Sequence, residues 1–432
     1  MATLPNPDDA VREPTASGVL LALAASLLFV VATRLPVART TAYDFDEAGY
    51  LVMIQEANFP MHHTLFLTSA KAIGLVVGDP YRGFVVLDVL SSALALAATW
   101  WFLRALVPSR TAAAAALALG VAPVFWSYGS MAANYTAIVL VGSILLGIAA
   151  RGRLAPHPLH PYAAAVTLAL GAGYRPDIGL FWLPVFLAIV WRHRWVAGLQ
   201  AMLLFTILNF AWIIPMLRDA GGWAKYREAT GEFANKAGWL NSIWILGPID
   251  ATLRYVLKGS MALASTLGLG LLFVPAGVSR LARRPGGPAL IGIMLLAVIP
   301  ALGVHLLVHF GVAGYAFHYV PALVALMAIG FAPAIEDALK RDRAGAARGL
   351  AVACSLAAVF LFYPTDLNAP GFRGQFDLSF ARHTRRGLAT PVLMRDPDFW
   401  RTTNSERLPG NVGELPAAPR KSLLQILPSS RD

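Results

Sequence analysis

Residues 43–50, YDFDEAGY, gather carboxylates and tyrosines in a chain that is otherwise poor in acidic residues. Asp44, Asp46 and Glu47 stand within this stretch, whereas the whole chain has 24 Asp and Glu among 432 residues. On a helix, Asp46 and Tyr50 lie on one face, while Asp46 and Glu47 diverge by about 100°. One carboxylate can therefore face a reaction centre while its neighbour holds a metal ion or a second hydroxyl. The same residues also suit the start of a helix, because Asp44 or Asp46 can cap it and Glu47 favours its first turn.

Histidines near this motif and late in the chain raise the question of a metal site: His62, His63, His305, His309 and His318. A divalent ion held by Asp46 or Glu47 together with His62 or His309 could bind a phosphate group. Hydrogen-bonded histidines inside a helix bundle are commoner than metal sites, and the spacing here matches no strong ligand signature. The sequence therefore leaves a divalent metal ion open as a cofactor.

The composition is that of a membrane protein. The hydrophobic residues make up 57% of the chain and the charged residues 14%, whereas an ordinary soluble domain has about 45–50% and about 25%. The net charge of +11 fits cytoplasmic loops facing anionic lipid better than it fits nucleic acid. The chain has no Gly-rich nucleotide loop, no CxxC pair and no GxSxG elbow. The sequence therefore gives no support for a nucleotide-driven pump, a redox protein or a serine hydrolase.

Apolar runs between charged or Pro/Gly-rich breaks predict an all-α polytopic membrane protein. We expect about eleven membrane spans, at residues 18–34, 83–103, 111–127, 134–150, 161–173, 178–191, 195–217, 259–278, 288–309, 315–333 and 349–363. The fifth and sixth runs are short and are separated by Gly171, Gly173 and Pro176, which suggests tilted helices or a break near one membrane face. Residues 1–363 thus form one membrane domain, followed by a polar tail at 364–432.

Basic residues predict the orientation, because short cytoplasmic loops are enriched in Lys and Arg. Alternate connections are basic: they hold Arg104 and Arg110, Arg151 and Arg153, Arg192 and Arg194, Arg280, Arg283 and Arg284, and Lys340, Arg341, Arg343 and Arg348. This alternation places the amino terminus in the cytoplasm and two long loops, 35–82 and 218–258, outside. The helical spacing of apolar residues in the first loop and over 223–245 predicts amphipathic helices at the membrane surface.

An acidic pair followed by a tyrosine, just outside the first membrane helix, resembles the GT-C fold glycosyltransferases. Within that class the chain is most similar to the protein O-mannosyltransferases and the lipid A aminoarabinose transferases. The resemblance continues in FPMHHTLF (59–66), YRGFVVLDVL (81–90), APVFWSYGSMAANYTA (122–137), GYRPDIGLFWLP (173–184) and FHYVPALVALMAIG (317–330). The charge-based topology places all these segments on the same outer face. The chain departs from the family at Asn134, where an acidic residue is common, and at His62 and His63, which replace a Pro pair.

The resemblance implies a GT-C bundle in the inner membrane that moves a sugar from a polyprenyl-phosphate carrier to a lipid, glycan or protein acceptor on the periplasmic side, with inversion. Asp46 is then the base that activates the acceptor hydroxyl, supported by Glu47 and Asp44. Positive charge for the departing phosphate comes from cations at the outer ends of helices. The candidate substrate-binding residues are Tyr50, His62, His63, Arg82, Arg175, Lys258, His318 and Tyr319.

Several of these residues also suit plain structural roles. Arg82 and Lys258 can extend to lipid headgroups, and Arg175 can pair with Asp177 across Pro176 to close a turn. Asp88, inside a predicted span, is costly in hydrocarbon, so we expect it to face the interior with a hydrogen bond or a partner such as Arg82.

The alternative function is a secondary transporter or lipid flippase whose Asp88, His305 and His309 line a substrate or proton path. A catalytically inactive scaffold of the same family is a third possibility. Transporters of that kind often show discontinuous helices in both halves, whereas this sequence suggests one break, near Gly173 and Pro176.

Overall fold

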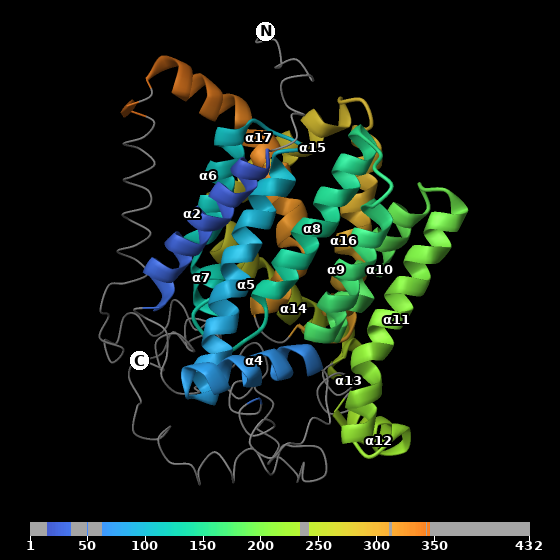
Figure 1. The fold of residues 1–432 in the computed structure, drawn as a ribbon. Helices are drawn as coiled ribbons and strands as arrows, with labels where there is room; N and C mark the ends of the chain where they lie inside the picture. Colours follow the sequence, from blue (N-terminus) through green and yellow to red (C-terminus); the bar gives the residue numbers. More distant parts are fainter. Residues whose placement is uncertain are drawn as a thin grey trace, which may run out of the picture.

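The structure, a computed structural model, describes residues 15–35, 50, 63–233, 242–310, 313–342 and 344–345, and within these ranges the regular elements are helices (Figure 1). The first half holds α2 (Ala16–Arg34), α4 (Thr64–Val77), α5 (Pro80–Leu103), α6 (Ser109–Gly120), α7 (Pro123–Tyr128), α8 (Thr136–Leu154), α9 (His160–Tyr174) and α10 (Pro176–Val190). The second half holds α11 (Trp195–Asp219), α12 (Trp223–Phe233), α13 (Ile243–Leu246), α14 (Pro248–Leu267), η4 (Gly268–Phe273), α15 (Val274–Ala282), α16 (Gly287–Leu307), η5 (Ala313–His318) and α17 (Val320–Arg341).

Six of the described helices are long and apolar enough to cross a membrane, namely α2, α5, α8, α11, α16 and most of α17. A seventh span is possible if the helices over 248–264 and 268–282, which meet at a bend of 101°, are counted as one. The chain is therefore a multi-pass helical membrane protein, as predicted. The count of eleven stays a prediction, because the expected last span, 349–363, and the tail lie outside the described residues.

Two predicted spans are broken, and glycine or proline explains each break. The run predicted at 111–127 is two helices, α6 and α7, because Pro123 disfavours a helical conformation at Ala122, which is extended with ψ 128°. The run predicted at 259–278 bends where Gly268 adopts a positive φ of 54°. The predicted interruption between the fifth and sixth runs is confirmed at Arg175, which is extended between α9 and α10.

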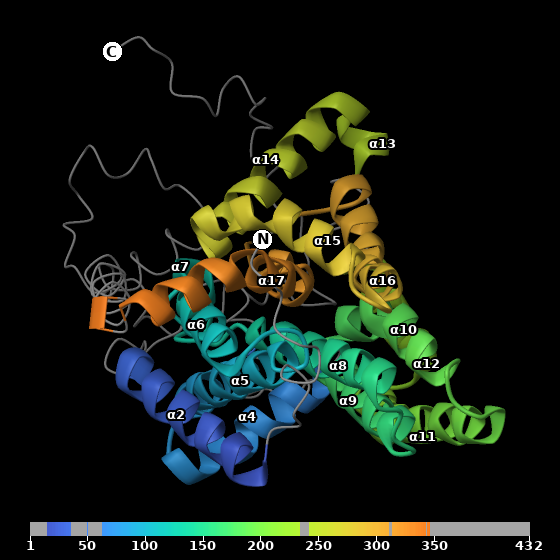
Figure 2. The ribbon, with the colours of Figure 1, turned by 90° about the horizontal axis from the view of Figure 1, so that it is seen from above.

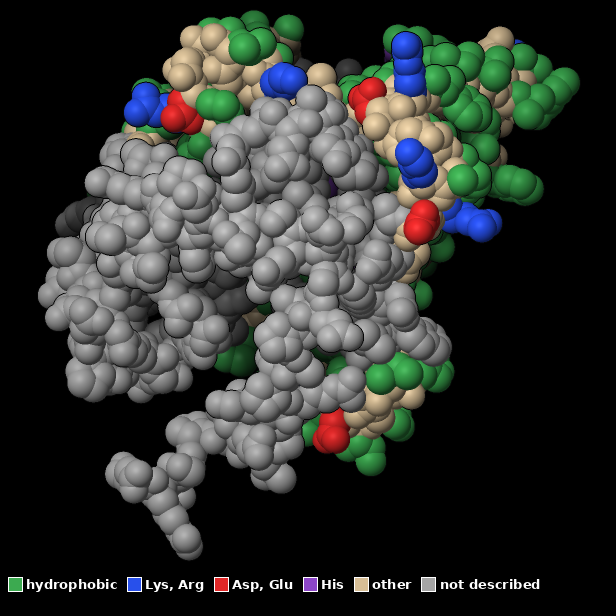
Figure 3. Space-filling view, turned by 90° about the horizontal axis from the view of Figure 1, so that it is seen from below, with side chains coloured by type: hydrophobic (Ala, Val, Ile, Leu, Met, Phe, Trp, Pro, Cys, Tyr) green, Lys and Arg blue, Asp and Glu red, His purple; other side chains and the backbone are tan. Residues whose placement is uncertain are grey.

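The helices run up and down the bundle, so that the basic connections gather at one end. We call the end that holds residues 104–110, 151–160, 191–195 and 280–287 the basic end, and the opposite end the α4 end. Figures 1 and 2 show α5, α8, α9, α10 and α16 side by side, with α4 lying across the α4 end. The helix predicted at the surface in the first loop is thus present as α4. At the margins of this end, a few described charged side chains of both signs lie among hydrophobic ones (Figure 3).

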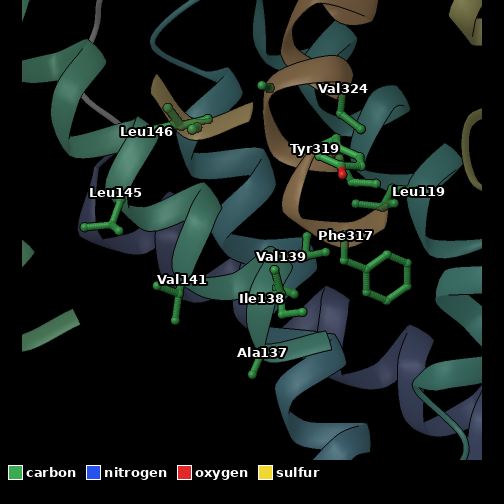
Figure 4. Packing of buried hydrophobic residues seen from close by; sticks show 14 of the residues in the cluster. Leu119, Ala137, Ile138, Val139, Val141, Leu145, Leu146, Phe317, Tyr319 and Val324 are labelled. Atoms are coloured by element: carbon green, nitrogen blue, oxygen red, sulfur yellow. The ribbon is translucent and has the colours of Figure 1, made fainter. Parts of the chain in front are cut away.

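Buried apolar side chains from most of the helices form one core. In Figure 4, Ile138 and Val139 of α8 lie near Phe317, which follows from the packing of α8 against η5 and α17. Helices α4 and α5 approach much more closely, through glycine. A Cβ added at Gly83 would lie 2.3 Å from the backbone oxygen of Ala70 and 2.7 Å from the backbone nitrogen of Gly74. The position of α4 therefore depends on the absence of a side chain at Gly83.

We expect Gly83→Ala to lower the free energy of unfolding by about 1–3 kcal/mol, because the added methyl meets backbone that cannot move aside. Thermal unfolding of the purified protein in detergent measures this. Gly292→Ala in α16 is the matched control, because a Cβ there meets nothing within 4 Å. This change should leave the free energy of unfolding unchanged, or raise it by up to about 1 kcal/mol through the higher helix propensity of alanine. Equal losses in the two variants would contradict the close α4–α5 contact.

Candidate functional site

A buried arginine stands at the break between α9 and α10. Arg175 is 5% exposed, and its extended backbone precedes Pro176, a conformation that the following proline favours. Its Nε donates to Asp177 Oδ1 at 3.1 Å and its Nη2 to Asp177 Oδ2 at 3.2 Å. The two-pronged ion pair that the sequence suggested across Pro176 is therefore formed.

The turn between α7 and α8, together with η5, supplies the other partners of Arg175. Nη1 of Arg175 donates to Oδ1 of Asn134, so each guanidinium nitrogen donates one hydrogen bond. The guanidinium also lies over the ring of Tyr135, 4.0 Å from its centroid, and 6.0 Å from the centroid of Tyr315. Asn134, which accepts the hydrogen bond from Arg175, has a left-handed backbone conformation with φ 47°.

Asp88 fixes that turn from the neighbouring helix α5. Its Oδ2 accepts from the backbone N–H of Ala133 at 2.6 Å and of Asn134 at 3.0 Å, and Oδ1 accepts from Thr136 Oγ1 at 3.5 Å. The side chain is completely buried. The expected inward position of Asp88 is confirmed, but its partners are backbone amides in place of Arg82. An acid inside the bundle thus supports the unusual backbone that presents Asn134 to Arg175.

His318 completes the arrangement from the end of η5. Its Nε2 lies 3.3 Å from Asp177 Oδ2, so one carboxylate serves both Arg175 and His318. Burial alone would lower the pKa of Arg175, but the Asp177 carboxylate reverses this and raises it well above its usual value. Burial lowers the pKa of His318, and Asp177 only opposes this in part. The network therefore holds a charged arginine, a carboxylate and a neutral imidazole that donates from Nε2.

A second polar group lies beside His318, between α14, α16 and η5. His305 Nδ1 is hydrogen-bonded to the hydroxyl of Tyr319, and the rings of His305 and His318 are 5.9 Å apart. His309 follows α16, with its ring 6.2 Å from that of Tyr255 on α14. Burial, with the charges of Lys258 and Arg254, lowers the pKa of His309 to about 4. His309 is thus neutral at physiological pH.

The end of the acidic motif meets this network at the α4 end. Tyr50 is 6% exposed, and its ring packs edge-on against His63 with centroids 5.4 Å apart. Nδ1 of His63 lies 3.0 Å from the backbone oxygen of Tyr174, which requires the proton to sit on Nδ1. Tyr50 is also close enough to Arg175 to act on its pKa. Helix α4 is thereby fastened to the same break that carries Arg175.

The structure brings together five of the predicted binding residues: Tyr50, His63, Arg175, His318 and Tyr319. Lys258 lies on α14, near His309. Arg82 is exposed in the first turn of α5 and forms no side-chain hydrogen bond or ion pair with the described part of the chain. Asp44, Asp46, Glu47 and His62 lie outside the described residues. Among the residues that the structure does describe, no three His, Cys, Asp or Glu are placed to hold a metal ion.

Sequence reasoning missed Asn134, Tyr135 and Tyr315 as partners of Arg175. The one signal for Asn134 in the sequence is that asparagine stands there in place of the acidic residue that is common in the family that the chain resembles. The role of Asp177 as a shared partner of Arg175 and His318 was also missed, because its second partner is distant in the sequence.

We expect Asp177→Asn to lower the free energy of unfolding by about 3 kcal/mol, because it leaves the buried Arg175 charge without its partner. The double variant Arg175→Gln/Asp177→Asn should lose less than the sum of the two single variants. A double-mutant cycle of unfolding in detergent measures the coupling. Additive losses would show that the two side chains are not paired.

Asp88→Ala should destabilise the protein by about 2 kcal/mol or more, because it removes the acceptor of two buried backbone amides. Asp88→Asn keeps a carbonyl oxygen and should cost less. Hydrogen exchange measured by mass spectrometry should rise for the peptide that contains Ala133 and Asn134. Unchanged exchange in that peptide would contradict the assigned hydrogen bonds.

No family model matches the sequence, and no curated protein matches it. In structure the chain is similar to ArnT from Cupriavidus metallidurans bound to undecaprenyl phosphate, with a TM-score of 0.54 and 16% identity, covering 82% of this chain and 67% of that one. The apo state of ArnT matches with a TM-score of 0.51, 16% identity and coverage of 81% and 66%. The chain thus spans about two thirds of the length of ArnT. It has the fold of the GT-C glycosyltransferases that the sequence resembles.

Proposed function

We propose that the protein is an integral membrane glycosyltransferase that moves a sugar from a polyprenyl-phosphate carrier to an acceptor at the α4 end, which faces the outside of the inner membrane. The observation that carries this proposal is the position of Tyr50, the last residue of YDFDEAGY. It packs against His63, which is hydrogen-bonded to Tyr174, the residue directly before the buried Arg175. The similarity to an ArnT structure that holds undecaprenyl phosphate supports the class of donor.

The reaction needs a base for the acceptor hydroxyl and positive charge for the departing phosphate. Asp46 is the proposed base, with Glu47 and Asp44 as supporting carboxylates or as ligands of a divalent ion. Inversion at the anomeric carbon follows if the hydroxyl attacks the donor directly, opposite the phosphate. The acceptor is a lipid, a glycan or a protein.

The contacts of Arg175 refine its proposed part in phosphate binding. Asp177 already neutralises its charge, and each guanidinium nitrogen already donates a hydrogen bond. We therefore assign most of the compensating charge to Lys258 of α14 and to Arg82, whose exposed side chain forms no salt bridge with a described carboxylate. Arg175 and His318 then shape the wall of the site, and an N–H of Arg175 that the network leaves unused can reach a phosphate oxygen.

The proposal is tested by incubating purified protein with glycolipid extract from host membranes and measuring release of polyprenyl monophosphate by mass spectrometry. Asp46→Asn should lower release by about 10²–10⁴-fold, the usual loss when a general base is removed. Expression and thermal stability should be unchanged. Glu228→Gln, which alters an exposed carboxylate of α12 at the same end, is the matched control and should release carrier at the wild-type rate.

Full release by Asp46→Asn would remove Asp46 as the base. If the wild-type protein binds the glycolipid but releases no carrier, the glycosyltransferase proposal fails. A flippase would then be detected as movement of the same lipid across liposomes. Loss of release on adding a chelator, restored by a divalent ion, would assign a metal to the reaction.

A further inference from the structure

Three histidine rings stand together at the basic end, far from the candidate site. His157 and His160 lie in and after the connection between α8 and α9, with ring centroids 5.7 Å apart. His193, from the connection between α10 and α11, has its ring 6.3 Å from that of His160. Arg153, in the last turn of α8, and Arg192, in the connection between α10 and α11, flank them. We call these five residues the histidine corner.

Backbone hydrogen bonds decide what the rings can bind. The N–H of Leu159 donates to His157 Nδ1 at 3.2 Å, and the N–H of His157 donates to His160 Nδ1 at 3.3 Å. Because each Nδ1 accepts, each neutral ring carries its proton on Nε2. Neither ring therefore offers a nitrogen lone pair to a ligand, and His157 presents an N–H donor. This arrangement suits an anion and does not suit a metal ion, which needs a nitrogen lone pair.

Groups of like charge lie close together in the histidine corner, because Arg192 acts electrostatically on both Arg153 and His193. Burial and the nearby Arg192 lower the pKa of His193, since a second positive charge is unfavourable there. Neither Arg153 nor Arg192 forms an ion pair with any carboxylate in the described ranges. The Nε atom of Arg153 is buried and has no hydrogen-bond partner. An anion at this point would remove the repulsion between these groups.

Two helix amino termini add to the same positive field. Helices α9 and α11 both begin at this corner and pack against each other. An acidic residue in the first turn often offsets the positive end of a helix dipole. Neither α9 nor α11 has an acidic residue there. At α9 the N–H groups of Leu159 and His160 already donate to His157, and Pro161 has none. A phosphate group near the first N–H groups of α11 is the ligand that such a terminus favours.

Exposed apolar side chains surround the corner and indicate where the phosphate comes from. Trp191 is 91% exposed, Trp195 76% and Leu159 61%. Tryptophan at the end of a membrane bundle lies at the level of the lipid headgroups. We propose that the histidine corner binds the phosphate of an anionic phospholipid in the leaflet at the basic end, with these side chains against its acyl chains.

The test titrates the purified full-length protein, in neutral detergent, with phosphatidylglycerol or phosphatidylcholine and counts bound lipid by native mass spectrometry. The wild-type protein should bind more phosphatidylglycerol than phosphatidylcholine. Arg153→Gln/Arg192→Gln should weaken that binding about tenfold, because two charge-assisted hydrogen bonds are lost. Arg110→Gln/Arg283→Gln is the matched control, since it removes two exposed charges at the same end but outside the histidine corner.

Three results would overturn the inference. Equal binding of the two lipids would remove the preference for an anionic headgroup. An equal loss in the control variant would show a general effect of surface charge. Competition by soluble glycerol phosphate as effective as that by the lipid would assign the site to a free phosphate compound. Retained preference in the control, with loss in Arg153→Gln/Arg192→Gln, supports the lipid site whether or not the protein transfers sugar.

Discussion

The paired charges of Arg175 and Asp177 impose the strictest demand on this bundle. A buried ion pair is tolerated only when hydrogen bonds satisfy its remaining atoms, because desolvation of both charges is costly. Asn134 and Tyr135 meet that demand from the turn before α8, and His318 meets it from the end of η5. The break between α9 and α10, the left-handed residue before α8 and the short η5 segment are irregular for the same reason: each brings a polar partner to one guanidinium or one carboxylate.

Local signals in the sequence predicted the framework well. Hydropathy located α2, α5, α8, α11 and α16, and alternating arginines predicted which connections share an end of the bundle. Pro176 predicted the interruption at Arg175, because proline acts on the residue directly before it. The same rule applies at Pro123, which interrupts the span expected at 111–127. Apolar spacing predicted α4, although not that Gly83 would let it touch the backbone of α5.

The partners inside the site could not be predicted from residue types. Asp88 binds backbone amides of a turn 45 residues away, and a backbone N–H leaves no mark in a sequence. Asn134 accepts from Arg175 in a backbone conformation with an unusual φ, and a hydropathy pattern carries no information on φ. The resemblance to glycosyltransferases supplied the chemistry for Asp46, Glu47 and Asp44, and those roles stay predictions. Tyr50 and His63 were also predicted to bind substrate, and that role stays a prediction, although the structure places both residues against the network.

The segment that carries the acidic motif is secured at both of its ends. Arg34, completely buried, donates from Nη2 to the backbone oxygen of Gly120 at 3.0 Å, and His63 is bonded to Tyr174. Both anchors are formed with the last residues of other helices, Gly120 of α6 and Tyr174 of α9. They therefore do not depend on the identity of the residues between Arg34 and His63. Substitutions in that stretch can change the chemistry of the motif while the anchors stay the same.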